Sequence, residues 1–218
     1  MLNAIDENNN YMGNLYKRIL VHIFNKVVRI RGRNNKIVGI ARRNVLIRGN
    51  NNIIECHSLA IGEGVKIIMN GDNHHLHIED NVTFKKGVCW FEDTGNKIII
   101  RRNTTIEDAH LSACEKETSI VVGKDCMLSS DIRIATTDSH SIIDKNSKKR
   151  INHAKSIKIG NHVWIGTRVT INKGVIIGDN SVVASNSLVT KNVCGSSVFG
   201  GIPAVMLRNN IDWVRERI

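Results

Sequence analysis

The sequence predicts an all-β protein wound as a parallel β-helix of hexapeptide repeats, and three observations carry this prediction. Residues 159–194 divide without a gap into six units of six, and each unit opens on an aliphatic residue: Ile159, Ile165, Ile171, Ile177, Val183 and Val189. A small or β-branched residue stands four places later in every unit. A strict period of six matches neither an amphipathic helix nor an alternating strand, and it is the signature of a parallel β-helix. Aromatic residues make up only 4% of the chain, with a single proline, which fits a narrow prism filled by Ile and Val.

The repeat length also predicts how the coils stack. Three hexads form one triangular coil, so Ile159 and Ile177, one coil apart, are expected to lie above one another in the core. Gly or Asn between the apolar positions permits the left-handed backbone conformation that a tight corner needs.

The chain divides into three predicted regions. Residues 1–36 form a helical cap, because apolar residues recur at three- and four-residue spacing over 11–30, with basic residues between them. An alternative role for this basic helix is contact with a membrane or an acidic polymer. Residues 37–207 form the β-helix, with a less regular repeat over 37–99, and residues 208–218 form a short C-terminal helix that covers the last coil.

One long segment interrupts the repeat. The pattern stops after Thr136 and resumes at Ile159, which predicts a protruding loop at about 136–157. The loop is polar and basic, and it contains His140 and His153. Ordering such an excursion costs conformational entropy, and long loops on a rigid scaffold tend to carry binding and catalysis.

The net charge indicates the kind of partner, and the cysteine content indicates the redox compartment. The formal net charge is +11, which favours anionic partners. The five cysteines are odd in number and never in a Cys-x-x-Cys pair, so we interpret them as small buried hydrophobes in a reducing compartment. Neither a signal peptide nor an apolar stretch of about eighteen residues is evident, so the expected location is cytoplasmic.

No metal site is expected. The group His74, His75 and His77 suggests metal ligands at first sight, but it lies at a probable corner without an evident carboxylate partner. These histidines are therefore predicted to be exposed turn residues.

Several phrases of the sequence resemble a known family. Val189-Thr190-Lys191, followed by Gly200-Gly-Ile-Pro-Ala204, is similar to the hexapeptide-repeat acyltransferases, and His162-Val-Trp-Ile-Gly166 resembles their sugar O-acetyltransferase branch. Thr137-Asp-Ser-His-Ser-Ile142, then Arg150-Ile-Asn152 and Lys155, resembles capsular polysaccharide and polysialic-acid O-acetyltransferases. The strong part of the resemblance covers residues 100–208.

This resemblance implies a left-handed β-helix, a homotrimer with active sites between subunits, acetyl-CoA as the donor and a carbohydrate acceptor. The positive charge favours an anionic polysaccharide as that acceptor. The family's catalytic histidine matches His140, and a tryptophan near its reacting centre matches Trp164. The positions that match its CoA contacts are Thr167, Ser185, Thr190, Lys191 and Arg208. His110 stands thirty residues before His140, where galactoside and maltose acetyltransferases carry an asparagine.

The chemistry of acetyl transfer assigns roles to these residues. A sugar hydroxyl needs a base to remove its proton, and His140 is the expected base. Asp138 or a loop carbonyl is expected to hold the imidazole, and backbone N–H groups near Gly166 or Ser185 are expected to stabilise the oxyanion. His110, Asp138 and His153 are candidate contacts to the acceptor. No Ser or Cys stands in a nucleophile motif, so direct attack on the thioester is expected.

Other functions remain open at this level. A small xenobiotic, such as a streptogramin or chloramphenicol, or a simple sugar is an alternative acceptor. A γ-type carbonic anhydrase shares the prism but needs three zinc-binding histidines, whose spacing is absent around His110 and His140. A non-catalytic scaffold is compatible with the charge. Nucleic-acid binding lacks a helix-turn-helix or an aromatic platform, so no nucleic-acid partner is expected.

Overall fold

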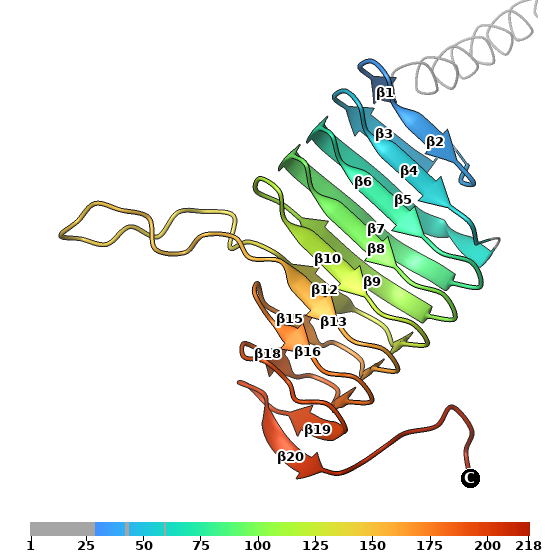
Figure 1. The fold of residues 1–218 in the computed structure, drawn as a ribbon, viewed down its shortest axis with the longest axis vertical. Coiled ribbons are helices and arrows are strands. Elements are labelled where there is room, and N and C mark those ends of the chain that lie inside the picture. The colour runs from blue at the N-terminus through green and yellow to red at the C-terminus, as the bar shows by residue number, and fades with distance from the viewer. Residues whose placement is uncertain (1–28, 42–43, 59) are drawn as a thin grey trace, which may run out of the picture.

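The chain forms a parallel β-solenoid whose coils stack along one axis (Figure 1). The computed structural model describes residues 29–41, 44–58 and 60–218. Within these residues the ladder consists of a 7-stranded sheet, in the order β16-β13-β10-β8-β6-β4-β2, and a 13-stranded sheet that wraps around the rest of the prism. The predicted all-β, parallel architecture is confirmed, and no helix occurs in the described residues.

Most strands have two to five residues, and β5, β7 and β9 are longer. Those of the 7-stranded sheet are β2 (Lys36–Val38), β4 (Ile53–Cys56), β6 (His75–Ile78), β8 (Lys97–Ile100), β10 (Ser119–Val122), β13 (Ile157–Ile159) and β16 (Ile176–Ile177). Those of the 13-stranded sheet are β1 (Ile30–Arg31), β3 (Val45–Arg48), β5 (Ala60–Asp72), β7 (Thr83–Thr94), β9 (Thr105–Ala113), β11 (Met127–Leu128), β12 (Ile132–Ala135), β14 (Trp164–Ile165), β15 (Thr170–Ile171), β17 (Val182–Val183), β18 (Leu188–Val189), β19 (Ser197–Gly200) and β20 (Val205–Asn209).

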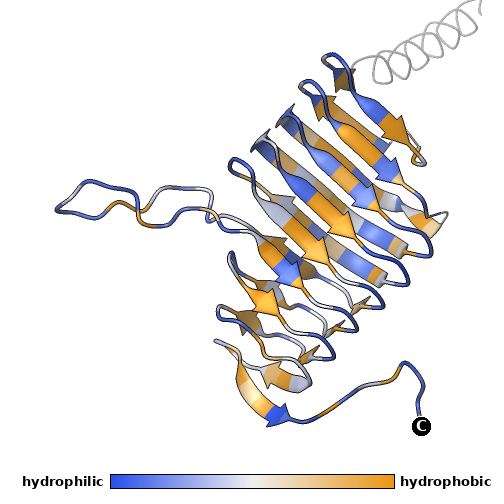
Figure 2. Cartoon of the chain, viewed as in Figure 1, coloured by the Kyte–Doolittle hydropathy of each residue, from blue (hydrophilic) through white to orange (hydrophobic). Residues whose placement is uncertain are grey.

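The hexads occupy the C-terminal coils in the predicted register. Ile159 pairs with Ile177, Ile165 with Val183 and Ile171 with Val189, one coil apart. All six side chains are buried. Each coil therefore adds one layer of aliphatic side chains to a continuous core, and hydrophobic residues recur from coil to coil along the stacked strands (Figure 2).

Most of the N-terminal coils are longer than the hexad rule predicts. In the first coil Lys36 pairs with Ile53, 17 positions on, but in the next coils the paired residues lie 22 positions apart, as between Asn52 and His74, whereas Asn161 and Asp179 are 18 apart. The longer coils contain β5 and β7, of 13 and 12 residues, and they enclose two phenylalanine rings, Phe84 and Phe91, at 0% exposure. The expectation that the prism has no room for rings is therefore wrong for these coils, because their perimeter is larger.

A polar ladder runs inside the long coils. Asn52 Oδ1 accepts from His74 N at 2.9 Å, His74 Nδ1 accepts from Asn96 N at 3.2 Å, and Asn96 Oδ1 accepts from Thr118 N at 2.8 Å. All four residues are buried, and burial lowers the pKa of His74. His74 is therefore an interior hydrogen-bonding residue in its neutral form, and its predicted place on an exposed turn is wrong.

Left-handed residues mark the corners, as predicted. One corner stacks residues with φ between 51° and 63°: Asn81, Asn103, Asp125, His162 and Asn180. Asparagine and aspartate tolerate this conformation better than most side chains. His162 occupies this corner one coil before Asn180, which explains why it lies at the surface of its coil.

Neither predicted terminal helix is present in the described residues. The predicted N-terminal helix over 11–30 lies outside the described residues except at its end, where Ile30 belongs to β1, and the predicted cap region 1–36 also contains Arg31 of β1 and Lys36 of β2. The predicted C-terminal helix over 208–218 is also wrong. Arg208 lies on β20, which pairs antiparallel with β19, and residues 210–218 form an extended tail (Figure 1).

The tail docks through two side chains rather than through a helical face. The ring of Trp213 stacks on His162 with centroids 4.2 Å apart, and its Nε1 donates to the His162 carbonyl at 2.8 Å. His162 Nδ1 lies 2.7 Å from Asp125 Oδ2, and Arg215 also binds Asp125. Partial burial opposes protonation of His162, but the Trp213 carbonyl and the Asp125 carboxylate outweigh it and raise the pKa of His162. The tail is thus held by tertiary contacts to the coil corner.

The cysteines are unpaired in the structure. Cys56, Cys89, Cys114 and Cys126 are buried free thiols, as predicted, whereas Cys194 is exposed. Among the described residues, no helix is long and apolar enough to cross a membrane.

Candidate active site

The predicted loop is a hairpin-shaped arm that projects from the solenoid between β12 and β13 (Figure 1). Ile143 and Arg150 form an antiparallel bridge, and Ile151 N donates to the Ile142 carbonyl at 2.9 Å. At the tip, Asp144 Oδ1 accepts from Ser147 N and Ser147 Oγ, each at 2.7 Å. The arm is therefore a hairpin with its own hydrogen bonds.

An ion pair fastens the base of the arm to the solenoid. Arg150 binds Glu115 through two parallel contacts, Nη1 to Oε2 at 2.8 Å and Nη2 to Oε1 at 2.5 Å. Thr137 Oγ1 donates to the same carboxylate. Both charged side chains are only 24% exposed, so solvent screens the pair less than it screens a surface pair. We call this contact the arm clasp.

Asn152 organises the segment that carries His140. Its Nδ2 donates to the His140 carbonyl at 2.8 Å and to Asp138 Oδ2 at 2.9 Å, while its Oδ1 accepts from Ile142 N at 2.7 Å. Lys173, on the next coil, binds the Asp138 carboxylate and donates to the Asn152 carbonyl at 2.7 Å. Asn152 is 8% exposed, so the turn around His140 rests on a buried amide.

These contacts change the role of Asp138. Lys173 and Asn152 engage its carboxylate and lower its pKa, and its carbonyl accepts from His140 N at 2.8 Å. Asp138 therefore holds the backbone of the arm. In the part of the chain that the structure describes, the hydrogen bonds of His140 involve its backbone groups, and its side chain is exposed.

The clasp predicts a pH-dependent stability. Arg150 lowers the pKa of Glu115 to about 2, against the opposing effect of burial, so the clasp stabilises the fold fully above about pH 4.5 and loses its contribution as the pH falls toward about 2. We expect Glu115→Gln to lower the free energy of unfolding by about 1–3 kcal/mol at pH 7. Urea unfolding of both proteins from pH 7 to pH 2.5 measures the difference, which should shrink below about pH 4.5.

The matched control for this prediction is Lys116→Gln, at the neighbouring exposed position, which should show no such pH-dependent difference. A difference between wild type and Glu115→Gln that is equally large at pH 2.5 and pH 7 would contradict the assigned ionisation of the clasp.

A hollow at the base of the arm contains His110. It is lined by Trp90, Glu92, His110, Ser112, Cys114, Ala135, Thr137 and Ser139. Partial burial, and then the positive charge of Arg133, lower the pKa of His110, which keeps the imidazole neutral at pH 7. Burial raises the pKa of Cys114 to about 12, so its thiol is not a nucleophile at neutral pH. Ser139 lines this hollow, and His140 is the next residue in the chain, so it lies at the edge of the hollow.

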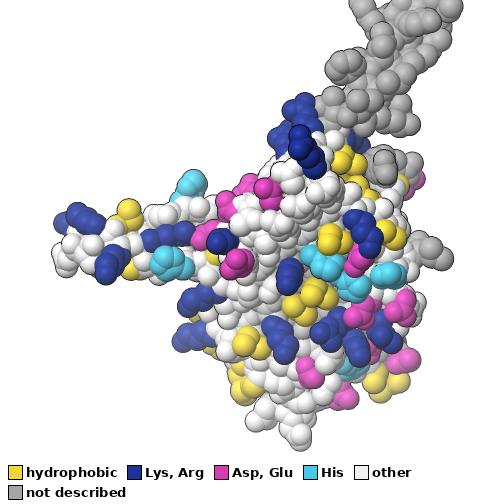
Figure 3. Space-filling view, turned by 45° about the horizontal axis from the view of Figure 1, so that its top comes forward, with side chains coloured by type: hydrophobic (Ala, Val, Ile, Leu, Met, Phe, Trp, Pro, Cys, Tyr) yellow, Lys and Arg dark blue, Asp and Glu magenta, His cyan; other side chains and the backbone are white. Residues whose placement is uncertain are grey.

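A second, basic hollow continues from His110 away from the arm. His110 lines both, and the second also contains Lys66, Lys86 and Arg133 together with Asp108 and Asp131. Lys86 pairs with Asp108 at 2.9 Å and Arg133 lies 3.9 Å from Asp131. Lys and Arg side chains also gather at the tip of the arm (Figure 3). His110 thus lies where a basic surface meets the arm.

The predicted cofactor contacts fall on two corners. Thr167 and Ser185 stack at one corner, where Thr167 N donates to Ser185 Oγ at 3.2 Å. The exposed pair Thr190 and Lys191 lies at the corner that follows β18, and Arg208 lies exposed on β20. The N–H of Gly166 itself donates to the Val183 carbonyl at 2.8 Å, so an oxyanion donor near Gly166 or Ser185 stays a prediction that requires another N–H group.

Trp164 and His153 occupy different surroundings. Trp164 points outward, as predicted, at 39% exposure, and its ring lies 6.1 Å from that of Trp213. It belongs to the row β11-β14-β17, whereas the arm leaves the row β12-β15-β18. Within one chain, Trp164 and the arm therefore lie on different sides of the prism. His153 is exposed at the end of the arm, next to Asn152.

Sequence reasoning missed the residues that position the arm. The Arg150-Ile-Asn152 phrase carried a family resemblance but no role, and Glu115 and Lys173 carried no signal. Their partners lie 35 residues away in each case. Local periodicity contains no information on such a pairing.

The chain was compared with known proteins. Residues 156–191 match the family described as bacterial transferase hexapeptide (six repeats). The chain is 40% identical over 121 residues to a polysialic acid O-acetyltransferase of Escherichia coli O1:K1 / APEC, and 38% identical over 112 residues to one of Neisseria meningitidis. These alignments cover 56% and 49% of this chain, but only 39% and 49% of the two relatives.

A solved structure extends the similarity to most of the fold. The polysialic acid O-acetyltransferase OatWY is 32% identical, with a TM-score of 0.77, over 86% of this chain and 91% of that one. The hexad register of the C-terminal coils and the coverage of this solved structure both indicate the same family. The chain belongs to the bacterial hexapeptide-repeat transferases, and within them it is similar to the polysialic acid O-acetyltransferases.

Proposed function

We propose that this chain is an acetyl-CoA-dependent O-acetyltransferase that acetylates a hydroxyl of polysialic acid. The observation that carries the proposal is the hollow shared by His110 and the clasped base of the arm, in a chain similar to enzymes of that name. The left-handed sense of the coils and a cytoplasmic location belong to the same proposal.

His140 is the general base of the proposed reaction. Its imidazole takes the proton of the acceptor hydroxyl as the oxygen attacks the thioester carbonyl, the C–S bond breaks as the ester C–O bond forms, and the proton passes to the departing CoA thiolate. A base in this role contributes roughly 10²–10⁴-fold. No acyl-enzyme is required, and the raised pKa of Cys114 supports direct attack.

Acetyl-CoA occupies the corners of the C-terminal coils in this proposal. Thr167 and Ser185 offer hydroxyls from one stacked corner, and Thr190 offers another. Lys191 and Arg208 are exposed cations that suit the phosphates of CoA. Trp164 offers an exposed aromatic face to the acetyl group or the sugar.

The positive side chains in the second hollow, next to His110, support an anionic acceptor. A polymer of sialic acid carries one carboxylate per residue, and Lys66, Lys86 and Arg133 line the hollow next to His110. His110 and His153 contact the acceptor, whereas Asp138 acts through the arm backbone. The positive surface raises the local concentration of polyanion, and this effect weakens with salt.

A homotrimer completes the site in this proposal. The arm exposes three isoleucines, Ile142, Ile143 and Ile151, at 55%, 56% and 63%. Apolar side chains on a projecting hairpin favour burial against a second subunit. A neighbouring chain then supplies the surface, including Trp164, that one chain does not bring to its own His140.

An acceptor panel tests the proposal. The full chain is incubated with acetyl-CoA and with polysialic acid, a neutral capsular polymer, simple hexosides or chloramphenicol, and free CoA thiol is measured. We expect turnover on polysialic acid and a decline of that turnover as salt is raised. Turnover confined to hexosides or chloramphenicol would overturn the acceptor, and no turnover on any of them would overturn the assigned activity.

A further inference from the structure

A second cluster of titratable side chains lies far along the fold from the arm, on the outer face of the 7-stranded sheet. Glu55 is on β4, and His75 and His77 are on β6, with Glu55 and His77 directly paired in the parallel register. Because side chains alternate along a strand, all three point outward while Ile54 and Leu76 enter the core at 0% exposure. Two packed strands therefore fix the three side chains on one face.

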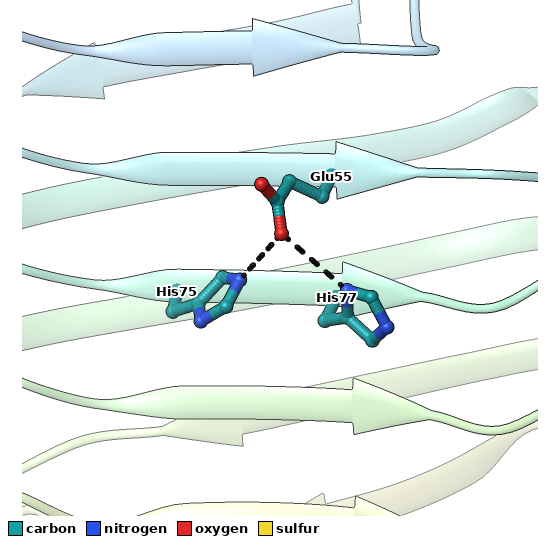
Figure 4. Close-up of side chains that lie close together, drawn as sticks. All are labelled: Glu55, His75 and His77. Atoms are coloured by element: carbon teal, nitrogen blue, oxygen red, sulfur yellow. Dashed lines mark hydrogen bonds and ion pairs between the residues drawn. The ribbon is translucent and has the colours of Figure 1, made fainter.

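The two imidazoles converge on one carboxylate oxygen (Figure 4). Glu55 Oε2 lies 3.3 Å from His75 Nε2 and 3.6 Å from His77 Nδ1. The three residues can each offer one donor atom so that all three atoms lie within 4.8 Å of one another. Ligands of a tetrahedral ion at bond lengths of 2.0–2.1 Å are about 3.3–3.4 Å apart, so little movement is needed to enclose a metal.

One oxygen of the Glu55 carboxylate faces the two histidines and is accessible to an ion. Lys36 Nζ binds the other carboxylate oxygen, Glu55 Oε1, at 3.0 Å and leaves Oε2 to the histidines. All three side chains are partly accessible, at 27–33%, so an ion can reach them from solvent.

We propose that Glu55, His75 and His77 bind a divalent transition metal ion of the zinc class, with solvent completing the coordination. Two imidazoles and one carboxylate favour such an ion over Mg²⁺ or Ca²⁺, which prefer sets of oxygen ligands. The ion cross-links β4 to β6, next to β2 at the end of the sheet, and so stabilises the N-terminal coils. The residues that line the two hollows at the arm are a separate set.

A competition titration tests the metal site directly. The full chain without a histidine tag is stripped with a chelator, and Zn²⁺ alone is titrated against a chromophoric zinc indicator. We expect one saturable site per chain. Each of Glu55→Gln, His75→Gln and His77→Gln should weaken Zn²⁺ binding by at least about tenfold. His153→Gln, a histidine on the arm, is the matched control and should leave the affinity unchanged.

A thermal readout guards against misfolded variants. Zn²⁺ should raise the Tm of the wild-type chain, because a ligand that binds only the folded state stabilises it, and it should not raise the Tm of Glu55→Gln. Circular dichroism of the metal-free variants should match that of the wild type, since the three residues are outside the core. Absence of a saturable Zn²⁺ site in the wild-type chain, or a Zn²⁺ affinity equal to that of the wild type in all three variants, would overturn the proposal.

Discussion

His140→Ala is expected to lower kcat/KM for acetyl transfer from acetyl-CoA by roughly 10²–10⁴-fold, the contribution of a positioned general base. The reason is chemical: in the proposed mechanism the His140 imidazole removes the hydroxyl proton as the ester bond forms, and alanine has no group that can do so. The fold should be unaffected, because the side chain is exposed and its neighbours hold only its backbone.

Thiol release with polysialic acid as acceptor measures this loss, with Ser141→Ala as the matched control on the same arm. Ser141 is exposed and is no part of the proposed machinery, so its substitution should leave the rate close to wild type. Melting curves of both variants should overlay that of the wild type. A His140→Ala rate equal to the Ser141→Ala rate would show that another group is the base.

Phe91→Ala should lower the free energy of unfolding by about 3–5 kcal/mol, the usual cost of removing a fully buried ring. Phe91 is 0% exposed on β7, and its ring lies 5.4 Å from that of His74, at the polar ladder. A cavity in this place loses apolar contacts and also loosens the packing around the buried imidazole.

Urea unfolding measures this loss, with Phe91→Leu as the comparison that keeps an apolar side chain in the coil. The leucine variant should lose much less stability, because most of the volume remains filled. Equal losses for Ala and Leu would mean that the ring itself, through its contact with His74, matters more than the space it fills.

The C-terminal coils could be predicted closely because their information is local. Each hexad contributes one inward aliphatic residue at a fixed interval, so the pairing of Ile159 with Ile177 follows from counting. The N-terminal coils could not be counted in the same way. The 22-residue length of most of them depends on long strands such as β5, whose Gly-rich sequence hides the period.

The ends and the histidine group failed for a related reason. The tail over 210–218 has apolar residues at helical spacing, yet the docking of Trp213 on His162 decides its structure. His74, His75 and His77 appeared to be one exposed group, but the inward register of His74 separates it from the other two. In both cases a contact distant in sequence determines where the side chain lies.

The position of the arm was predicted, but the contacts that hold it were not. The break in the repeat located the arm and His140, and the structure confirms a projecting hairpin at that place. The clasp between Glu115 and Arg150, and the hold of Lys173 on Asp138, join residues 35 positions apart. Such pairs leave no periodic trace, so only the folded chain shows how the arm is held.

The measurement that tests the central claim most directly is detection of the product. Polysialic acid is incubated with acetyl-CoA and the full chain, and the recovered polymer is examined by proton NMR for the methyl signal of a new O-acetyl ester. The account predicts that this signal appears with the wild-type chain and is nearly absent with His140→Ala. An ester signal of equal size with both proteins, or CoA release without any ester on the polymer, would contradict the account.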